Sequence, residues 1–455
     1  PNKLMVKFRH RLITWLIKAY IKKWGKHILV YFAIGLAVFF ILRFFFGTTL
    51  ENLQVQKQES IGMVGAYELE NLQPDILNKL SLGLTVVEKD GTIKPGIAER
   101  WKVGNDGKAY VFYLKKNLYF TDGTNLTSDH IQYNFTDVSV TRPNKYTIVY
   151  MLKDRYSPFL VTVSKPVFKK GLIGISETKL KDIKLNGDFV QSLFLVSKNG
   201  HKTIYQFYPT IEALKIAYSL GEVSKIVDLP DTRFKNTTFD TFKNAKVERV
   251  VNYLRLVTLF YNTQDKLVSS KTLREALSYT IPDEFKFGLR NFGPYTPFSF
   301  ANQQISGLHK QDLAHAKELL DKSKEENKSD EKITLTIEYL DKYKAAAEDI
   351  VDIWKKLDID VELKIVDKIP SRFQIFLGEF NLPVDPDQYT LWHSDQSSNI
   401  THYANLRVDK LLEDGRKEID IEKRKIIYAD FQKFIQSDPP ASFLFFPYQY
   451  NVTRK

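Results

Sequence analysis

The sequence has 455 residues, 43% hydrophobic and 26% charged, so we expect most of it to fold and to form two or three domains. Its formal net charge of +12 belongs to one end, because residues 1–50 carry nine Lys or Arg and no Asp or Glu, and the remaining residues carry 57 basic against 54 acidic side chains. A nearly neutral body gives no reason to expect nucleic acid as a partner. The absence of cysteine excludes disulfides, thiolate metal sites, a cysteine nucleophile and a lipid on an N-terminal cysteine.

The N-terminal region predicts a single-pass membrane anchor. Residues 28–46 form a nearly unbroken apolar run, about the length that crosses a bilayer, and Arg43 near its outer edge can reach the interface. Residues 1–27 are basic, so the positive-inside rule places them in the cytoplasm and the folded body outside the cell or in the periplasm, after a linker at 47–58. A cleaved signal peptide is the alternative, but the run exceeds a usual h-region and lacks a small-x-small cleavage site.

The basic segment has two open interpretations. Residues 4–24 can form an amphipathic helix on the inner leaflet, where Lys and Arg near anionic lipid each contribute about 1 kcal/mol. A solvated basic leader explains the same composition. In either case we expect residues 1–46 to contact membrane lipid.

Beyond the linker, strand and helix patterns alternate along the chain. Alternating or continuous apolar runs predict strands at 59–67, 108–116, 204–209, 251–262 and 442–452. Apolar spacing and end signals predict helices at 210–223, 269–281, 312–324 and two within 407–438, with Thr210 as one N-cap and Gly221 near its C-cap. Residues 333–366 read as a β–α–β unit with a parallel strand pair. The prediction is an α/β fold with a mixed sheet in more than one domain.

Motifs for catalysis or metal binding are missing. The sequence has no Gly-rich phosphate loop and no GxSxG or HExxH motif, and the glycines of GNDGK at 104–108 have the spacing of a hairpin turn. His393 and His402 are nine residues apart and do not form a helix-face pair of metal ligands. We therefore expect no cofactor, no metal site and no enzymatic activity.

The stretch 117–135, NLYFTDGTNLTSDHIQYNF, reads as a strand, a turn and a helix start. Asp122 and the following glycine supply the turn, and Thr127 is a good N-cap for a helix beginning at Ser128. Tyr133 and Phe135 are expected to pack against the sheet, whereas His130 is expected at a surface or edge.

A long irregular stretch at 377–403 mixes aromatic side chains with Asp, Asn, Ser and Pro. Polar and aromatic loops on a rigid α/β frame are common ligand sites, although a structural role explains the composition as well. The side chains expected to line a ligand are aromatics for stacking and carboxylates for cationic groups: Glu379, Phe380, Asp385, Trp392 and Tyr403.

Several segments in order resemble one family, the solute-binding proteins of ABC importers that carry oligopeptides, dipeptides and sometimes nickel or oligosaccharides. The most specific is TIKPGIAERWKVGNDGKAYVFYLKKNLYFTDGTNLTSDHIQYNF at 92–135. Weaker blocks follow in register, namely IEALKIAYSLGEV, LREALSYTIPDE, AKELL, DIWKKLDIDVEL, DPDQY, VDKLLEDG and DPPASFLFF. The resemblance covers about residues 59–450.

The resemblance implies a two-lobed, periplasmic-binding-protein-like fold of type 2, the large peptide-binding class, which closes around its ligand by a hinge motion. It implies a first lobe of 59–255 with 431–455 and a second lobe of 256–430, with hinge crossings near Asn262 and Ile435. Such a protein hands a peptide or a similar small polar solute to an ABC permease with its ATPase subunits and performs no chemistry.

One departure from the family concerns the ligand. Peptide binders of this family carry Gly-Trp and then an Asp that holds the peptide ammonium, four residues before the Pro of an Asp-Pro pair. Counting back from Pro386, the Trp position is Glu379 and the Asp position is Leu382. Two hypotheses therefore stand: a membrane-tethered solute-binding subunit, or the same fold reused as an extracellular structural or interaction module that has lost its ligand.

Overall fold

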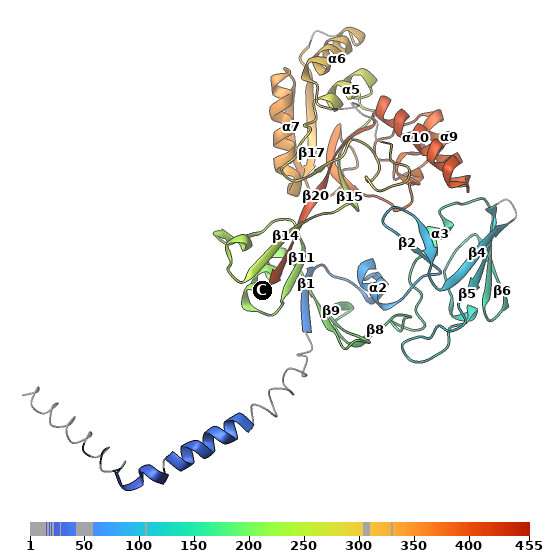
Figure 1. The fold of residues 1–455 in the computed structure, drawn as a ribbon. Helices are drawn as coiled ribbons and strands as arrows, with labels where there is room; N and C mark the ends of the chain where they lie inside the picture. The colour runs from blue at the N-terminus through green and yellow to red at the C-terminus, as the bar shows by residue number, and fades with distance from the viewer. Residues whose placement is uncertain are drawn as a thin grey trace, which may run out of the picture. The chain divides into compact units, whose positions relative to one another are not determined.

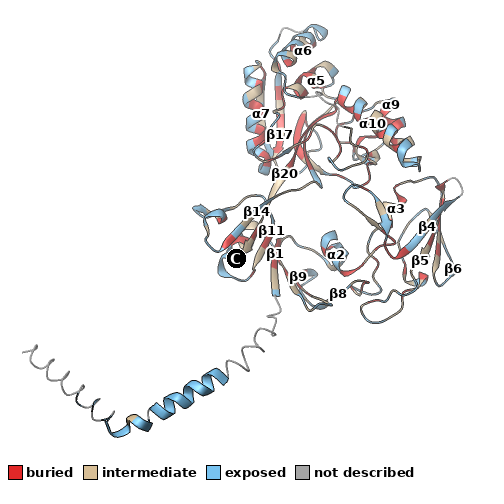
Figure 2. Ribbon diagram, viewed as in Figure 1, coloured by how far each residue is buried: buried red, intermediate tan, exposed pale blue. Residues whose placement is uncertain are grey.

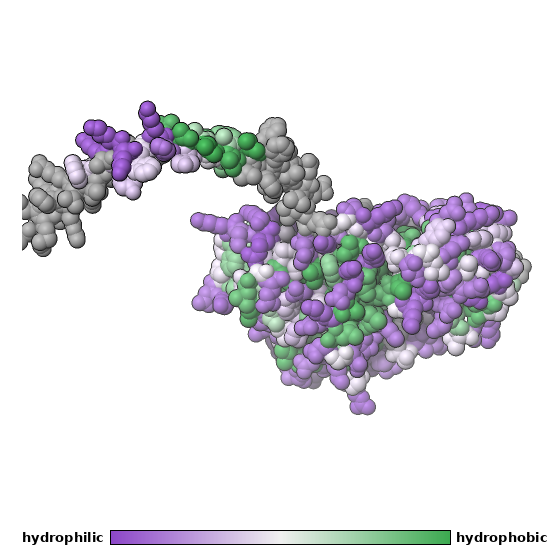
Figure 3. All heavy atoms as spheres, turned by 90° about the horizontal axis from the view of Figure 1, so that it is seen from below, coloured by the Kyte–Doolittle hydropathy of each residue, from purple (hydrophilic) through white to green (hydrophobic). Residues whose placement is uncertain are grey.

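The computed structural model describes residues 15, 18, 20, 22–27, 29–41, 58–104, 107–303, 310–328 and 331–455. The chain separates into two compact units, one holding the N-terminal region and the other holding residues 59–198 and 203–455 (Figure 1). In the described part of the first unit, one helix, Lys22–Ile41, is long and apolar enough to cross a membrane. The described apolar side chains of this helix are exposed, and Figure 3 shows them as a run of hydrophobic residues. The rest of the predicted span, 42–46, and the linker up to residue 57 lie outside the described residues.

Among the described residues of the second unit, twelve strands form one mixed sheet in the order β18-β17-β19-β15-β20-β11-β1-β10-β9-β8, with β14 and β16 also pairing with β20. A four-stranded sheet has the order β4-β5-β7-β6, and β2–β3 and β12–β13 form small pairs. The strands are β1 Gln58–Val64, β2 Thr85–Val87, β3 Ile93–Pro95, β4 Ala98–Gly104, β5 Ala109–Leu114, β6 Val138–Asn144, β7 Thr147–Leu152, β8 Thr178–Asn186, β9 Phe189–Ser197, β10 Lys202–Tyr208, β11 Lys225–Leu229, β12 Arg233–Phe234, β13 Thr237–Thr238, β14 Ala245–Val251, β15 Arg255–Tyr261, β16 Gly288–Arg290, β17 Thr334–Leu340, β18 Asp360–Val366, β19 Ile375–Asn381 and β20 Ala441–Arg454.

Helices cover these sheets. The α-helices are α2 Pro74–Leu80, α3 Phe159–Thr162, α4 Ile211–Leu220, α5 Lys271–Tyr279, α6 Leu313–Glu326, α7 Lys344–Lys356, α8 Tyr389–Trp392, α9 Leu406–Lys417 and α10 Ile421–Ser437. Short 3-10 turns are η1 Leu69–Asn71, η3 Ser128–His130, η4 Phe239–Thr241 and η5 Asp341–Tyr343. The predicted caps of α4 are confirmed, because the Thr210 side chain accepts from the Ala213 N–H and Gly221 ends the helix with φ 88°.

The predicted β–α–β unit is also confirmed: β17, α7 and β18 follow in order, and β17 pairs with β18 in parallel. Strand β15 alternates its side chains between two cores. Leu256 and Phe260 belong to a cluster with Trp392 and Phe431, whereas Val257, Leu259 and Tyr261 belong to one with Trp354. Buried residues accordingly concentrate on the strands between two helical layers (Figure 2).

Strand β20 links the two halves of the large sheet. Its first part pairs with β15 and β16 up to Pro447, and its second part pairs with β14 and β11 from Tyr448 onward. At the change of partners, the N–H of Asn252 donates to the Pro447 carbonyl at 3.0 Å. Ile435 is buried in the Trp392 cluster, and the Asn262 amide nitrogen donates to the Phe373 carbonyl at 2.8 Å. Ile435 and Asn262 therefore both lie beside the half of the sheet that packs against the Trp392 cluster.

The stretch 117–135 packs beside the four-stranded sheet. The Asp122 carboxylate accepts from the Thr124 N–H at 2.9 Å, Gly123 has φ 86°, and Tyr133 and Phe135 contact the core around Phe112. The predicted helix is wrong in extent, because only the single turn η3 forms before the chain becomes extended at Ile131. His130 has a defined structural role, since its Nδ1 accepts from the Thr127 N–H at 3.1 Å and closes the turn.

Candidate functional site

The first candidate site lies at the carboxyl ends of parallel strands. Strand β17 pairs in parallel with β18 and with β19. The chain runs from β17 through α7 to β18 on one side and then returns to β19 on the other side, so its direction across the sheet reverses there. Ligands of open α/β sheets bind outside the carboxyl ends of strands at such a reversal. The residues there are those of η5, directly after β17, and Glu379 near the end of β19.

Glu379 is the centre of a charged cluster at this edge. Its Oε1 accepts from Arg255 at 3.0 Å and from Lys342 Nζ at 2.6 Å, and its Oε2 accepts from the Tyr343 hydroxyl. The Glu379 side chain is 17% exposed, whereas those of Arg255 and Lys342 are each 47% exposed. The carboxylate is therefore occupied by the protein's own donors, and the two cations keep further N–H groups that can reach a ligand.

Electrostatics keep Glu379 charged. Burial, the largest influence, would raise the pKa of Glu379, but hydrogen bonds from Lys342 and Tyr343 and the charges of Lys342 and Arg255 outweigh it and hold the pKa below its ordinary value of 4.5. Because the folded-state pKa lies below the unfolded value, this group contributes stability that is present above about pH 4.5 and lost as the pH falls through the folded pKa.

The difference in unfolding free energy between the wild type and Glu379→Gln should therefore be largest above about pH 4.5 and shrink as the pH falls below it. Urea unfolding at a series of pH values measures this difference. A difference that stays constant across this range would contradict the assigned ion pairs.

A second parallel pair brings an acidic residue near the cluster. Strands β1 and β11 pair in parallel, and Asp228 lies in a register shift of β11 with φ 61°. Burial and then Asp75 raise the pKa of Asp228, while the nearby charge of Arg255 lowers it. The charge of Arg255 thus acts on Asp228 as well as on Glu379.

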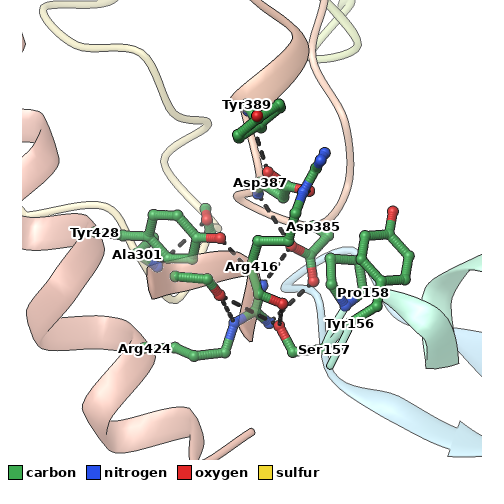
Figure 4. A network of polar contacts seen from close by, with 12 residues as sticks. Tyr156, Ser157, Pro158, Ala301, Asp385, Asp387, Tyr389, Arg416, Arg424 and Tyr428 are labelled. Atoms are coloured by element: carbon green, nitrogen blue, oxygen red, sulfur yellow. Dashed lines mark hydrogen bonds and ion pairs between the residues drawn. The ribbon is translucent and has the colours of Figure 1, made fainter. Parts of the chain in front are cut away.

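The loop after β19 carries a second polar network (Figure 4). Asp385 forms a bidentate ion pair with Arg424 of α10, at 2.7 and 3.0 Å, and both side chains are buried. The Arg424 Nε donates to the Gly415 carbonyl at 3.0 Å. Asp387 accepts from Arg416 Nε at 2.9 Å, and burial, the largest influence, raises the pKa of Asp387 although Arg416 lowers it. These pairs fix the loop to α9 and α10.

The same network reaches the four-stranded-sheet region. The N–H of Ser157 donates to the Arg416 carbonyl at 2.8 Å, and its hydroxyl donates to the Arg416 and Gly415 carbonyls at 3.0 and 3.2 Å. The Arg416 guanidinium lies over the rings of Tyr156 and Tyr389, at 5.5 and 4.1 Å from their centroids. The segment before α3 is thereby hydrogen-bonded to the end of α9.

A cavity of about 100 Å³ lies beside this contact. Its wall includes Asp385, Arg424 and otherwise mainly apolar side chains from both the four-stranded-sheet region and the helical side. Burial raises the pKa of Tyr110, which also lines the cavity, to about 12. Among the described residues, no group of three or more His, Asp or Glu side chains is arranged to hold a metal ion.

Comparison with known proteins places this chain in a family. Residues 92–184 and 201–402 match the family model for bacterial extracellular solute-binding proteins, family 5 Middle, which is more than half of the chain. The chain belongs to this family. Among curated relatives, the oligopeptide-binding protein AppA of Bacillus subtilis is 23% identical, with 84% of this chain and 83% of AppA covered. The periplasmic oligopeptide-binding protein OppA of Salmonella typhimurium is 22% identical, with 85% of this chain and 87% of OppA covered.

Solved structures confirm the predicted fold class for this family 5 protein. The ABC transporter substrate-binding protein CtaP of Listeria monocytogenes superposes with a TM-score of 0.73 at 20% identity, covering 88% of this chain and 94% of CtaP. NikZ of Campylobacter jejuni, solved in complex with Ni(L-His), gives a TM-score of 0.69 at 19% identity with the same coverage. The chain therefore has the two-lobed periplasmic-binding-protein fold.

Within this family 5 fold, the five side chains expected at the ligand do not form one site, because Phe380, Trp392 and Tyr403 share a hydrophobic cluster whereas Glu379 and Asp385 lie in two polar networks. Glu379 lies in the charged cluster and Asp385 lines the cavity. Trp392 is buried in the core and donates from Nε1 to Gln388, and Tyr403 is buried with its hydroxyl 3.1 Å from Asp438. Phe380 is partly buried and packs edge-on against Trp392. Some side chains of the stretch 377–403 thus belong to the hydrophobic core, and others belong to the candidate sites.

Sequence reasoning missed the cations of both clusters. Lys342 directly follows the strand of a predicted β–α–β unit, so its position at a strand's carboxyl end was a usable signal. Arg255 lies within the predicted strand 251–262, and Arg424 lies in a charged helical segment. Nothing local distinguishes either cation from solvated residues. The hydrogen bond from Ser157 to α9 could not be predicted either, because it joins residues that are 259 positions apart.

Proposed function

We propose that this protein is a membrane-tethered extracellular solute-binding subunit of an ABC importer. It captures peptides or similar polar solutes between its lobes and delivers them to a permease coupled to ATPase subunits, without performing chemistry itself. The observation that carries the proposal is the Arg255–Lys342–Glu379 cluster at the carboxyl ends of β17 and β19, in a chain of the family 5 fold.

The cluster suits a solute that offers hydrogen-bond acceptors. Glu379 orients Arg255 and Lys342, and their remaining N–H donors are directed to carbonyl or carboxylate oxygens of the solute. Peptides carry such oxygens along their backbone and at their C-terminus. Because Leu382 is buried and apolar and Glu379 is occupied, the solute's ammonium group is not the main anchor.

The lobes of the proposed binding protein meet at strand β20. The change of partners at Pro447 and its hydrogen bond to Asn252 support crossings there, with a first lobe of 59–252 and 448–455 and a second lobe between. We propose these crossings in place of those near Asn262 and Ile435, which the resemblance implies. Closure about them would bring Arg255 and Asp228 onto opposite sides of the solute.

The tether of the proposed subunit is the helix Lys22–Ile41, whose apolar side chains are exposed. The basic residues before it favour a cytoplasmic N-terminus, with residues 1–46 in contact with lipid. We expect the protein to remain in the membrane pellet after alkaline carbonate extraction. Its release into the supernatant would contradict the tether.

Calorimetric titration of the full chain with a pool of tripeptides tests the proposed site. Arg255→Gln and Lys342→Met should each weaken binding by about tenfold to a hundredfold, the range for a lost hydrogen bond to a charged group. Lys364→Gln, an exposed cation on β18, is the matched control and should bind as the wild type does. Unchanged binding in both cluster variants would exclude this site.

The second candidate function is an extracellular interaction module without a ligand. The occupied Glu379 carboxylate favours it, because the protein's own groups satisfy the site. In that case the wild type would give no binding heat with any solute pool, and the cluster variants would change only stability.

A further inference from the structure

We propose that the cavity beside α3 and α10 is a subsite for a branched aliphatic group of the bound solute, such as the side chain of leucine. The inference rests on the proposed solute-binding function and adds a chemical preference to it. The cavity has a volume of about 100 Å³, and its walls come from segments far apart in the sequence. An engineered apolar cavity of about 150 Å³ in another protein admits benzene, so this space suits a group of a few carbon atoms.

The apolar lining comes from both sides of the Ser157 contact. One side is provided by β3 and α3, and the other by the loop that contains Phe300 and by the α9–α10 connection. The residues are Ile93, Leu160, Val161, Phe300, Ile419 and Ile421. Gly107 packs directly against Ile419 of the wall, because a Cβ at Gly107 (φ 87°) would lie 1.9 Å from Ile419 Cδ1. Only glycine allows the β4–β5 hairpin to approach Ile419 this closely.

Polar groups in the wall are already partnered. Asp385 and Arg424 pair with each other, and the Tyr110 hydroxyl donates to the Tyr156 carbonyl at 3.0 Å. The Ser157 hydroxyl donates to carbonyls at the end of α9. Among the described residues, the buried polar side-chain atoms that lack a hydrogen-bond partner all lie outside this lining. A group that enters the cavity therefore meets no polar atom that lacks a hydrogen-bond partner.

A charged group would lose its hydration in the cavity without gaining a counterion. The one ion pair in the wall is mutually neutralised, and breaking it would leave a second buried charge. An aliphatic group has only its apolar surface to transfer from water, and this transfer favours binding. The cavity thus selects for an uncharged hydrocarbon group.

Titration of the full chain in nanodiscs with Ala-Leu-Ala, Ala-Gly-Ala and Ala-Asp-Ala tests the subsite. The wild type should bind Ala-Leu-Ala at least about tenfold more tightly than Ala-Gly-Ala, because several methyl and methylene groups are buried. Val161→Trp, which fills the cavity from α3, should abolish this preference, and Ile365→Trp, on an exposed position of β18, should keep it. Equal affinity for the leucine and glycine peptides would overturn the subsite and leave the proposed function standing.

A second readout does not depend on peptide binding. Because the chain contains no cysteine, Val161→Cys and Ile365→Cys can be labelled at single sites. Relative to Ile365→Cys, Val161→Cys should react at least about tenfold faster with an uncharged isobutyl methanethiosulfonate than with its trimethylammonium analogue. Equal ratios at the two sites would overturn the apolar subsite. If no peptide binds but the ratio holds, the proposed function fails and the cavity's preference stands.

Discussion

Replacing Arg424 by leucine should lower the free energy of unfolding by about 3–5 kcal/mol, because the substitution leaves the Asp385 carboxylate buried without a counterion. Both side chains are less than 10% exposed, and Asp385 receives two hydrogen bonds from the guanidinium. The Gly415 carbonyl also loses the hydrogen bond from Arg424 and keeps the one from the Ser157 hydroxyl. Urea unfolding measures the change.

A double variant distinguishes the loss of the whole ion pair from the loss of only one of its charges. Arg424→Leu combined with Asp385→Leu removes both charges and should recover much of the loss, since a buried pair exchanged for apolar residues is often neutral in stability. Lys410→Met, which removes an exposed partner of Asp414, is the matched control and should cost no more than about 1 kcal/mol. A loss in Arg424→Leu as small as the control's would contradict the buried network.

Trp392→Ala should lower the free energy of unfolding by about 3–5 kcal/mol and leave solute selectivity unchanged. The side chain is buried in the cluster of α8, α9 and α10, where Phe380 and Phe443 pack edge-on against its ring. Its Nε1 donates to Gln388 at 2.8 Å, and that partner is also left unsatisfied by the substitution.

The matched control for this prediction is Trp101→Ala on β4, because Trp101 is only partly buried and should cost less. Unfolding curves give the stabilities, and titration of the folded variants gives the affinities. A Trp392 variant that keeps wild-type stability and loses solute binding would show that the indole belongs to the ligand site and would contradict its place in the core.

The sequence patterns predicted most of the frame, because the relevant signals are local. Thr210 and Gly221 mark the two ends of α4 through capping and backbone conformation alone. The β17–α7–β18 unit follows from the periodicity and length of its segments. The stretch 117–135 shows where local signals fail to predict the length of a helix. Thr127 can start a helix, but η3 ends after one turn, and the extended chain that follows packs Tyr133 and Phe135 against the core of the sheet.

The site depends on contacts that no local pattern contains. Glu379 is 124 residues from Arg255, and Asp385 is 39 residues from Arg424. The composition of 377–403 indicated a mixed polar and aromatic segment but not the direction of each side chain. The short helix α8 turns Trp392 inward, whereas Asp385 precedes it and faces the cavity. Composition therefore located the region, and tertiary packing assigned its residues.

Thermal unfolding of the full chain with pools of di- to pentapeptides tests the central claim most directly, namely that this protein binds a solute. Binding to the folded state alone should stabilise it by about 2.7 kcal/mol at a hundredfold excess over Kd, and the gain should shrink in Arg255→Gln. An unfolding transition that no pool of peptides or other small polar solutes displaces would contradict the claim and favour the interaction module.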